Sequence, residues 1–314
     1  MRVLFGCRFT TALCVGLLLP CLSAHAWDSR RLAVPLLIEH HEIPYAEFSI
    51  FAMPGAHLRV AIAAEGARAE YRFGEDSGNL GGATLVAPAE PGLSILEILN
   101  VDTGESARIN VFTMVPGSQV TADGRLNGYR IGQYPEQPLR NLAIYRPPQG
   151  FVEVTEDNAD TRVSPNFTLR QFLSKQESGF PKYLVLRPVL LLKLEKILAA
   201  LNENGVKANG LVIMSGYRTP FYNKLIGNVT YSRHAWGGAA DFYVDQSPHD
   251  AQMDDLNDDG RIDKADAEWL ADFLDDMTQS GDFGRNVGGI GVYDRTAAHG
   301  PFVHVDARGM AVRW

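Results

Sequence analysis

The chain has 314 residues, of which 46% are hydrophobic and 21% are charged. This is the composition of an ordinary globular protein, and it excludes a disordered or fibrous one. The 37 acidic residues outnumber the 29 basic ones and no basic stripe occurs, so nucleic acid is not an expected partner, because binding phosphates requires clustered Lys and Arg.

Residues 1–26 are predicted to be a cleavable export signal. Arg2 and Arg8 open it, the apolar stretch TTALCVGLLLPC follows, and the small residues AHA close it. A retained anchor is the alternative, but no apolar run in the chain reaches the roughly 20 residues of a membrane span. Lipid attachment at Cys21 is disfavoured by the preceding Pro20. We therefore expect a periplasmic or secreted protein.

All three cysteines lie inside the predicted signal. The mature chain can therefore form neither a disulfide nor a thiolate metal site. Its stability has to come from hydrophobic cores or from bound metal, which fits a bacterial periplasm better than a eukaryotic secretory route.

Residues 27–120 are predicted to form an all-β, sandwich-like domain. Short alternating or β-branched segments such as FSIFAMPG, LRVAIAA and LSILEILNV are separated by Gly, Pro, Asn or Asp. The cluster EHHE at 39–42 is the only one here that could suggest a metal site. Adjacent histidines of a strand point to opposite faces, so we interpret it as solvated residues.

Residues 121–159 are rich in Gly, Pro and turn residues and are predicted to be a surface linker. Residues 160–314 are predicted to form an α+β domain with a small antiparallel sheet and flanking helices. SPNFTLRQFLSK indicates a turn and a short helix capped by Ser164 or Asn166, and LRPVLLLKLEKILAALNENG an amphipathic helix ending at Gly205. The expected strands are GLVIMSGYR, AADFYVD, VGGIGVY and FVHVDARG, with EWLADFLDDM as a second helix.

The stretch SRHAWGGAADFYVD contains two candidate metal ligands, His234 and Asp241. A hydrolytic zinc site needs three His, Asp or Glu ligands and one position left open for water. Gly237 and Gly238 argue against one continuous helix, so we expect His234 in a loop and Asp241 in the following strand. His304, in the strand FVHVD, is the natural third ligand. By itself the His–x6–Asp spacing is a weak signal.

Further motifs accompany this pair in a set order. SGYRTP precedes SRHAWGGAAD, and HVDARG with the terminal Trp314 ends the chain. Together these segments resemble the zinc D-Ala-D-Ala carboxypeptidases and murein endopeptidases of the lysostaphin and hedgehog-like metallopeptidase superfamily. The resemblance covers about 160–314 and implies that His234, Asp241 and His304 bind Zn²⁺.

The same resemblance implies catalytic roles for Arg218 and His299, and the alternation of side chains along a strand suggests one for Asp306. Arg218 matches the arginine that holds a terminal carboxylate or the charge developing on the scissile carbonyl, the alternative being a structural ion pair. His299 matches the position of a general base, although it could simply be solvated. Asp306 lies on the same strand face as His304 and could orient that imidazole or act as the base itself.

A second metal site is predicted inside this domain. DLNDDGRIDKAD, residues 255–266, has the spacing of a calcium loop, with Gly260 at the sharp turn. The alternative is an acidic turn that caps the next helix. The ligands of a structural Ca²⁺ would be the side chains of Asp255, Asn257, Asp259 and Asp266 and the backbone carbonyl of Arg261.

We therefore expect zinc-dependent hydrolysis of amide bonds in the stem peptides of peptidoglycan. The sequence leaves open carboxypeptidase or endopeptidase action. Two alternatives are a zinc- and calcium-containing module that binds the cell wall without cutting it, and an adhesion protein.

Overall fold

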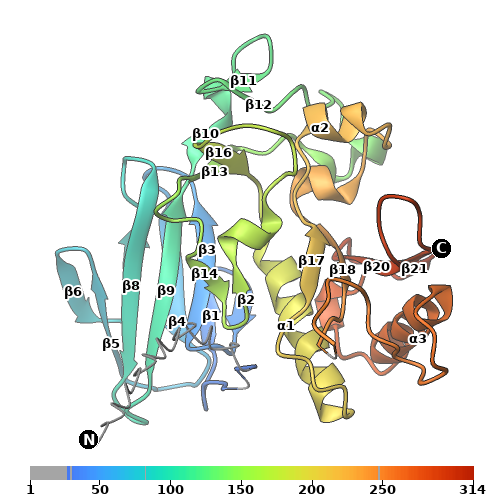
Figure 1. The fold of residues 1–314 in the computed structure, drawn as a ribbon. Coiled ribbons are helices and arrows are strands. Elements are labelled where there is room, and N and C mark those ends of the chain that lie inside the picture. Colours follow the sequence, from blue (N-terminus) through green and yellow to red (C-terminus); the bar gives the residue numbers. More distant parts are fainter. Residues whose placement is uncertain (1–26, 29, 82, 247) are drawn as a thin grey trace, which may run out of the picture.

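The computed structural model describes residues 27–314 apart from residues 29, 82 and 247. The predicted signal, 1–26, lies outside the described residues. The protein has a mixed α and β structure with several small sheets (Figure 1). No helix in the described ranges is long and apolar enough to cross a membrane. The α-helices of this part are α1 (Pro188–Glu203), α2 (Pro220–Leu225) and α3 (Lys264–Gln279).

The N-terminal part contains two sheets, and strands such as β1 and β4 alternate between buried and more exposed positions. The smaller sheet has the order β2-β1-β4-β7, with β1 (Leu36–Ile38), β2 (His41–Ile43), β4 (His57–Ile62) and β7 (Thr84–Val86). The larger has the order β3-β9-β8-β5-β6, with β3 (Glu47–Ala52), β5 (Ala69–Phe73), β6 (Asp76–Asn79), β8 (Gly92–Asn100) and β9 (Ser106–Thr113).

The segment expected to be a surface linker carries regular structure and buried side chains. β13 pairs with β10 on one side and β16 on the other, and Ile131, Phe151 and Val154 are buried. Its turn residues join short strands instead of forming a flexible tether. The strands of this middle part are β10 (Val115–Pro116), β11 (Arg125–Leu126), β12 (Tyr129–Arg130), β13 (Gly150–Val154), β14 (Arg162–Ser164), β15 (Phe167–Thr168) and β16 (Lys182–Leu184).

The short helix after β15 starts later than expected from its sequence. The 3-10 helix η4 (Leu169–Phe172) is capped by Thr168, whose side chain forms a capping box with Gln171. The predicted caps, Ser164 and Asn166, are wrong. Ser164 belongs to β14, and Asn166 instead donates its side-chain N–H to Glu195. The helix begins after Thr168 because Thr–x–x–Gln is a capping-box pattern, which satisfies two backbone N–H groups at the helix start.

The C-terminal sheet has the strand order β17-β18-β20-β19-β21. Its neighbours are antiparallel except β19 and β21, which pair in parallel. α3 packs against β19 and β20. The strands are β17 (Val212–Ser215), β18 (Ala239–Tyr243), β19 (Gly289–Tyr293), β20 (Phe302–Asp306) and β21 (Val312–Arg313).

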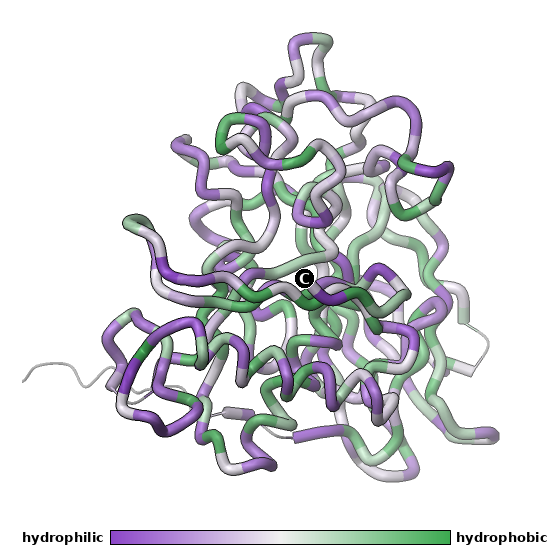
Figure 2. The backbone as a smooth tube through the Cα atoms, turned by 90° about the vertical axis from the view of Figure 1, so that its right-hand side faces the viewer, coloured by the Kyte–Doolittle hydropathy of each residue, from purple (hydrophilic) through white to green (hydrophobic). Residues whose placement is uncertain are grey.

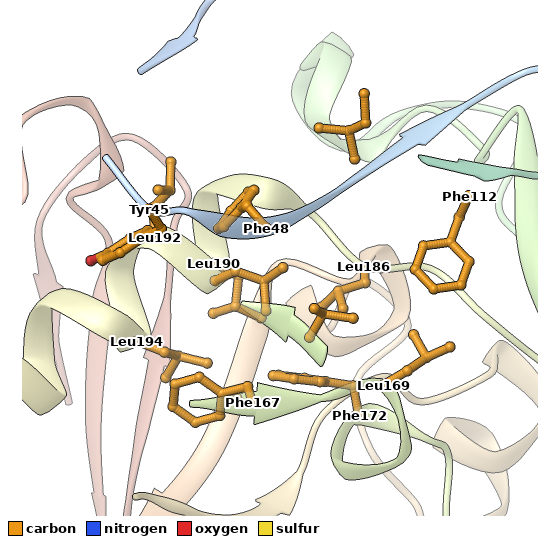
Figure 3. Packing of buried hydrophobic residues seen from close by; sticks show 14 of the residues in the cluster. Tyr45, Phe48, Phe112, Phe167, Leu169, Phe172, Leu186, Leu190, Leu192 and Leu194 are labelled. Atoms are coloured by element: carbon orange, nitrogen blue, oxygen red, sulfur yellow. The ribbon is translucent and has the colours of Figure 1, made fainter. Parts of the chain in front are cut away.

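One hydrophobic core extends from the N-terminal sheets to the C-terminal sheet. Phe48 of β3 faces Leu190 of α1, and Phe167 and Phe172 close the same cluster from below (Figure 3). α1 ends at Glu203 with Asn204 as its C-cap, and Gly205 follows at φ +91°, as its sequence predicts. The C-terminus lies near the middle of the face shown in Figure 2.

Candidate metal centre

Three neighbouring strands align polar side chains in one row. In the sheet register Ser215 of β17 faces Asp241 of β18, and Asp241 faces His304 of β20. Directly opposed residues of adjacent strands point to the same face of a sheet. The fold therefore places Asp241 and His304 side by side although 63 residues separate them.

His234 reaches this row from outside the sheet. It belongs to the 3-10 helix η5 (Arg233–Trp236), which ends at Gly237 with φ +63°. A Cβ at Gly237 would lie 2.2 Å from the carbonyl oxygen of Val185, so both the backbone conformation and the close approach require glycine. Trp236 is buried among Tyr134, Tyr145 and Tyr231 and anchors this short helix.

The three side chains converge with a spacing that suits a metal ion. Asp241 Oδ1 lies 3.1 Å from His234 Nε2 and 2.7 Å from His304 Nδ1, and the two nitrogens are 3.2 Å apart. A tetrahedral zinc with ligands at about 2.0–2.1 Å separates its ligand atoms by roughly 3.3 Å. In the described part of the chain, this is the group of His, Asp, Glu or Cys side chains that could share an ion.

The hydrogen bonds on the outer side of the imidazoles favour metal binding. His234 Nδ1 lies 2.6 Å from the carbonyl oxygen of Gly216, which can only accept, so Nδ1 carries a proton and neutral His234 presents a lone pair at Nε2. His304 Nε2 lies 3.5 Å from Asp306 Oδ2, which leaves Nδ1 free to act as a ligand. Once His304 Nδ1 has lost its proton, two nitrogen lone pairs and a carboxylate oxygen point to the same place, which a cation can occupy.

Burial and the contacts within the cluster shift the pKa values of all three side chains. Burial lowers the pKa of His234 more than the nearby Asp241 raises it. Burial opposes ionisation of Asp241 as well, but the two histidines outweigh it and hold the pKa of that carboxyl well below its usual range. Burial lowers the pKa of His304, but its contacts with Asp241 and Asp306 outweigh this and raise the pKa above its usual value. Metal binding would therefore displace a proton from His304.

Arg218 lies next to the metal-ligand cluster, as the resemblance implies. Its Nη2 contacts Asp241 Oδ2, the carboxylate oxygen that faces away from the histidines, and its Nε donates to Ser215 Oγ at 2.8 Å. Only 11% of the Arg218 side chain is exposed. The guanidinium orients Asp241 and at the same time presents a positive charge at the edge of the cluster.

Asp306 is fully buried behind His304 and is held by several donors. Its Oδ1 accepts from the backbone N–H of Gly289 at 3.1 Å and its Oδ2 pairs with Arg308 Nη2 at 2.5 Å. Contacts with His304 and Arg308 outweigh burial and keep the pKa of Asp306 well below its usual range. A carboxylate bound in this way orients an imidazole and is poorly placed to collect a proton.

His299 lies in the loop before β20 and is not among the residues brought together. It is half-buried, its Nδ1 lies 2.8 Å from the carbonyl oxygen of Gly300, and its ring packs edge-on against Phe302. These contacts are local to the loop.

The structure also places near the cluster three residues to which the sequence analysis assigned no role. Lys193 of α1 is fully buried and donates to the backbone carbonyl of Asp306 at 2.9 Å. A lysine on the apolar face of the LLLKLEK helix is the signal that could have revealed it. Trp314 lies over Gly291, and its ring centroid is 5.3 Å from that of His304. Arg308 pairs with Asp306. Its position two residues after Asp306 is the only sequence signal for this pair.

The predicted calcium loop is a hydrogen-bonded turn in the structure. Asp255 accepts from the backbone N–H groups of Asp259 and Gly260. Asp266 forms a capping box with Asp263 at the start of α3 and also accepts from Leu256. Within the described residues, the acidic side chains of this loop do not converge as those of the zinc candidate do. Calcium binding stays a prediction.

The His234, Asp241 and His304 side chains form a group that could hold a metal ion, as a metal-dependent hydrolase requires. Comparison with known families supports this class, since the sequence model of the family described as Peptidase M15 matches residues 165–258. The predicted resemblance to this metallopeptidase family is thereby confirmed for the C-terminal region. The matched segment contains Arg218, His234 and Asp241 but ends before His304. No curated protein sequence matches the chain.

Proposed function

We propose that the protein is a zinc-dependent peptidase that cleaves amide bonds in the stem peptides of peptidoglycan, in the periplasm or outside the cell. The observation that carries the proposal is the convergence of His234 Nε2, His304 Nδ1 and Asp241 Oδ1 within 3.2 Å of one another. The Peptidase M15 match supports a peptide substrate, and the predicted export signal supports access to the cell wall.

The residues around the cluster have separate roles in this proposal. Zinc bound by His234, Asp241 and His304 would polarise the scissile carbonyl and lower the pKa of a water molecule. Arg218 keeps Asp241 in place and offers its guanidinium to the carbonyl or to a terminal carboxylate of the substrate. Asp306 orients His304. His299 is then the candidate proton carrier, provided that its loop brings it to the substrate.

The experiment that tests the proposal is chromatography of muropeptides after incubation with zinc-loaded protein. Release of free D-alanine from pentapeptides would indicate a carboxypeptidase, and splitting of cross-linked dimers an endopeptidase. Stoichiometric zinc without any cleavage would contradict the proposal and favour the non-catalytic cell-wall-binding module. The control is the same protein after removal of zinc with a chelator.

The two candidates for proton transfer are expected to differ in their effect on the metal. Asp306→Asn should lower both zinc affinity and turnover by about 10–100-fold, because the imidazole of His304 loses its orienting partner. His299→Ala should leave zinc affinity unchanged and lower turnover by roughly 100-fold, the usual scale of general acid–base catalysis. Zinc titration and turnover on a defined stem peptide measure both effects.

The control for these variants is His57→Ala, which removes an exposed histidine from β4 in the N-terminal part. Wild-type turnover in the His299 variant would show that the proton is carried by another group. Wild-type zinc affinity and turnover in the Asp306 variant would refute the orienting role.

Calcium is proposed to stabilise the 255–266 loop. At a calcium concentration 100 times the dissociation constant, binding should add about 2.7 kcal/mol to the free energy of unfolding. Asp255→Asn should largely remove the calcium-dependent rise in melting temperature, because this carboxylate occupies the first ligand position. Asp258→Asn is the matched control, since it removes the same charge from a position that is not a ligand. An unchanged calcium response in the Asp255 variant would identify the loop as an acidic turn.

A further inference from the structure

A large cavity lies between the N-terminal sheets and the C-terminal part of the chain. Its volume is about 1270 Å³, and it is separate from the metal-ligand cluster. Segments far apart in the sequence form its walls: the β1–β2 turn, the first half of α1, the 3-10 helix η6 (Gly284–Asn286) and the residues after β20. α1 contacts both β2 and η6, and Figure 1 shows β2 beside α1.

The charge of this cavity is opposite to that of the whole protein. The chain carries a formal net charge of −8, yet Glu42 is the acidic residue among the residues that line the cavity. The EHHE cluster, interpreted from sequence as solvated, contributes two histidines to the same wall. The cationic lining residues are Arg31, Arg187, Lys196, Arg285 and Arg308.

Most of these cations have no carboxylate partner among the residues that the structure describes. Arg308 pairs with Asp306. Arg187 donates only to backbone carbonyls, those of Trp236 and Ile144, and Lys196 donates to the carbonyl of Asp282. Between described residues, no ion pair involves Arg31, Arg187, Lys196 or Arg285. Several surface arginines elsewhere do form ion pairs, for example Arg68 with Asp102.

Arg233, which does not line the cavity itself, is buried next to the lining residue Arg187. Arg233 is 3% exposed, and its Nη1 donates at 3.3 Å to the Ile144 carbonyl that also accepts from Arg187. Its Nε and Nη2 have no hydrogen-bond partner among the described residues. Burial and the neighbouring Arg233 lower the pKa of Arg187 to about 10. The ring of Tyr145 offsets part of the positive charge of Arg233 through a cation–π contact at 5.2 Å.

Buried cations without a carboxylate are costly, and a negative charge in the cavity beside Arg187 and Arg233 would offset that cost. The N-terminus of α1 adds a positive dipole end, since Arg187 is its N-cap and its first turn contains no acidic residue. We propose that this cavity is a binding site for a small polyanion that bears carboxylate or phosphate groups.

The position of the site relates it to the candidate metal centre. Arg308 lines the cavity and also binds Asp306, whose Oδ2 lies 3.5 Å from His304 Nε2. An anion in the cavity would therefore lie two side chains away from a metal ligand. The proposal does not depend on peptidase activity, because it rests on the cavity and its charges alone.

Two probes test the proposal on the full-length protein freed of metal with a chelator, so that no bound ion can recruit the anion. Calorimetric titration with tricarballylate and with inorganic pyrophosphate, in buffer matched for ionic strength with NaCl, measures binding. Tighter binding of the first identifies carboxylates as the preferred groups, and tighter binding of the second identifies phosphates. Absence of binding by both probes would overturn the proposal.

Variants then locate the bound anion. Lys196→Gln with Arg285→Gln removes two lining cations that lie at least partly in solvent, and should weaken binding by about 10-fold or more. Arg68→Gln with Arg72→Gln removes the same charge from the N-terminal sheet and should leave affinity within about two-fold, because screened charges at a distance contribute little. Equal affinity in both double variants would show that the anion binds elsewhere and would overturn the proposal.

Discussion

Alanine in place of His234, Asp241 or His304 is expected to abolish stable zinc binding and to lower peptide hydrolysis by about 10²–10³-fold or more. A hydrolytic zinc site with three protein ligands needs all three, and the electrostatic help from the metal is usually the largest single contribution to such a reaction. Metal analysis of dialysed, zinc-loaded protein and turnover on a stem peptide measure the two effects. The wild-type protein should retain about one zinc per chain.

Circular dichroism accompanies the metal analysis, because the result counts only if each variant is folded. His57→Ala is the control for loss of a histidine. Full zinc occupancy in all three variants would refute the ligand assignment. Zinc affinity should also fall as the pH falls through the pKa of His304, which Asp241 and Asp306 raise, because a proton competes with the metal for this imidazole.

Gly237→Ala is expected to destabilise the protein by about 2–5 kcal/mol. The positive φ of +63° costs a non-glycine residue about 1–2 kcal/mol, and the forced displacement of packed atoms costs about 1–3 kcal/mol more. The neighbouring atom is the backbone carbonyl oxygen of Val185, 2.2 Å from the added Cβ, which cannot move aside as a flexible side chain would. Urea unfolding of the metal-free protein measures the change in free energy.

The matched control for this prediction is Gly227→Ala. Gly227 has a similar φ of +71°, but a Cβ added there would meet no heavy atom within 4 Å. It should cost only the conformational part, about 1–2 kcal/mol. Equal losses in the two variants would show that the approach to Val185 contributes nothing. Zinc affinity should fall only in the Gly237 variant, because Gly237 accepts no substitution without moving η5 and its His234.

The sequence alone indicated most local features of the C-terminal region. The amphipathic period and the final glycine predicted α1, and the glycine pair after His234 predicted a break before the strand that carries Asp241. These features depend on residues close together in the chain, whose backbone preferences act without tertiary context. The order of the motifs was also sufficient to recognise the family that matches residues 165–258.

Tertiary structure decided which groups surround the candidate ligands. The Gly216 carbonyl sets the tautomer of His234, and Lys193 reaches Asp306 from a helix more than 100 residues away in sequence. The different roles proposed for Asp306 and His299 also follow from packing, since Asp306 is held by Arg308 and His299 contacts only its own loop and Phe302.

The sequence by itself determined the likeness to metallopeptidases and the residue types of the metal centre, because these reside in short motifs with a set order. Only the tertiary structure decided that the supposed linker is folded and that its Ile144 carbonyl is shared by Arg187 and Arg233. It also decided that the β1–β2 turn closes a cationic cavity against α1. The physical reason is that charge and shape at such a site are sums over residues from distant segments, and no local pattern records which segments the core brings together.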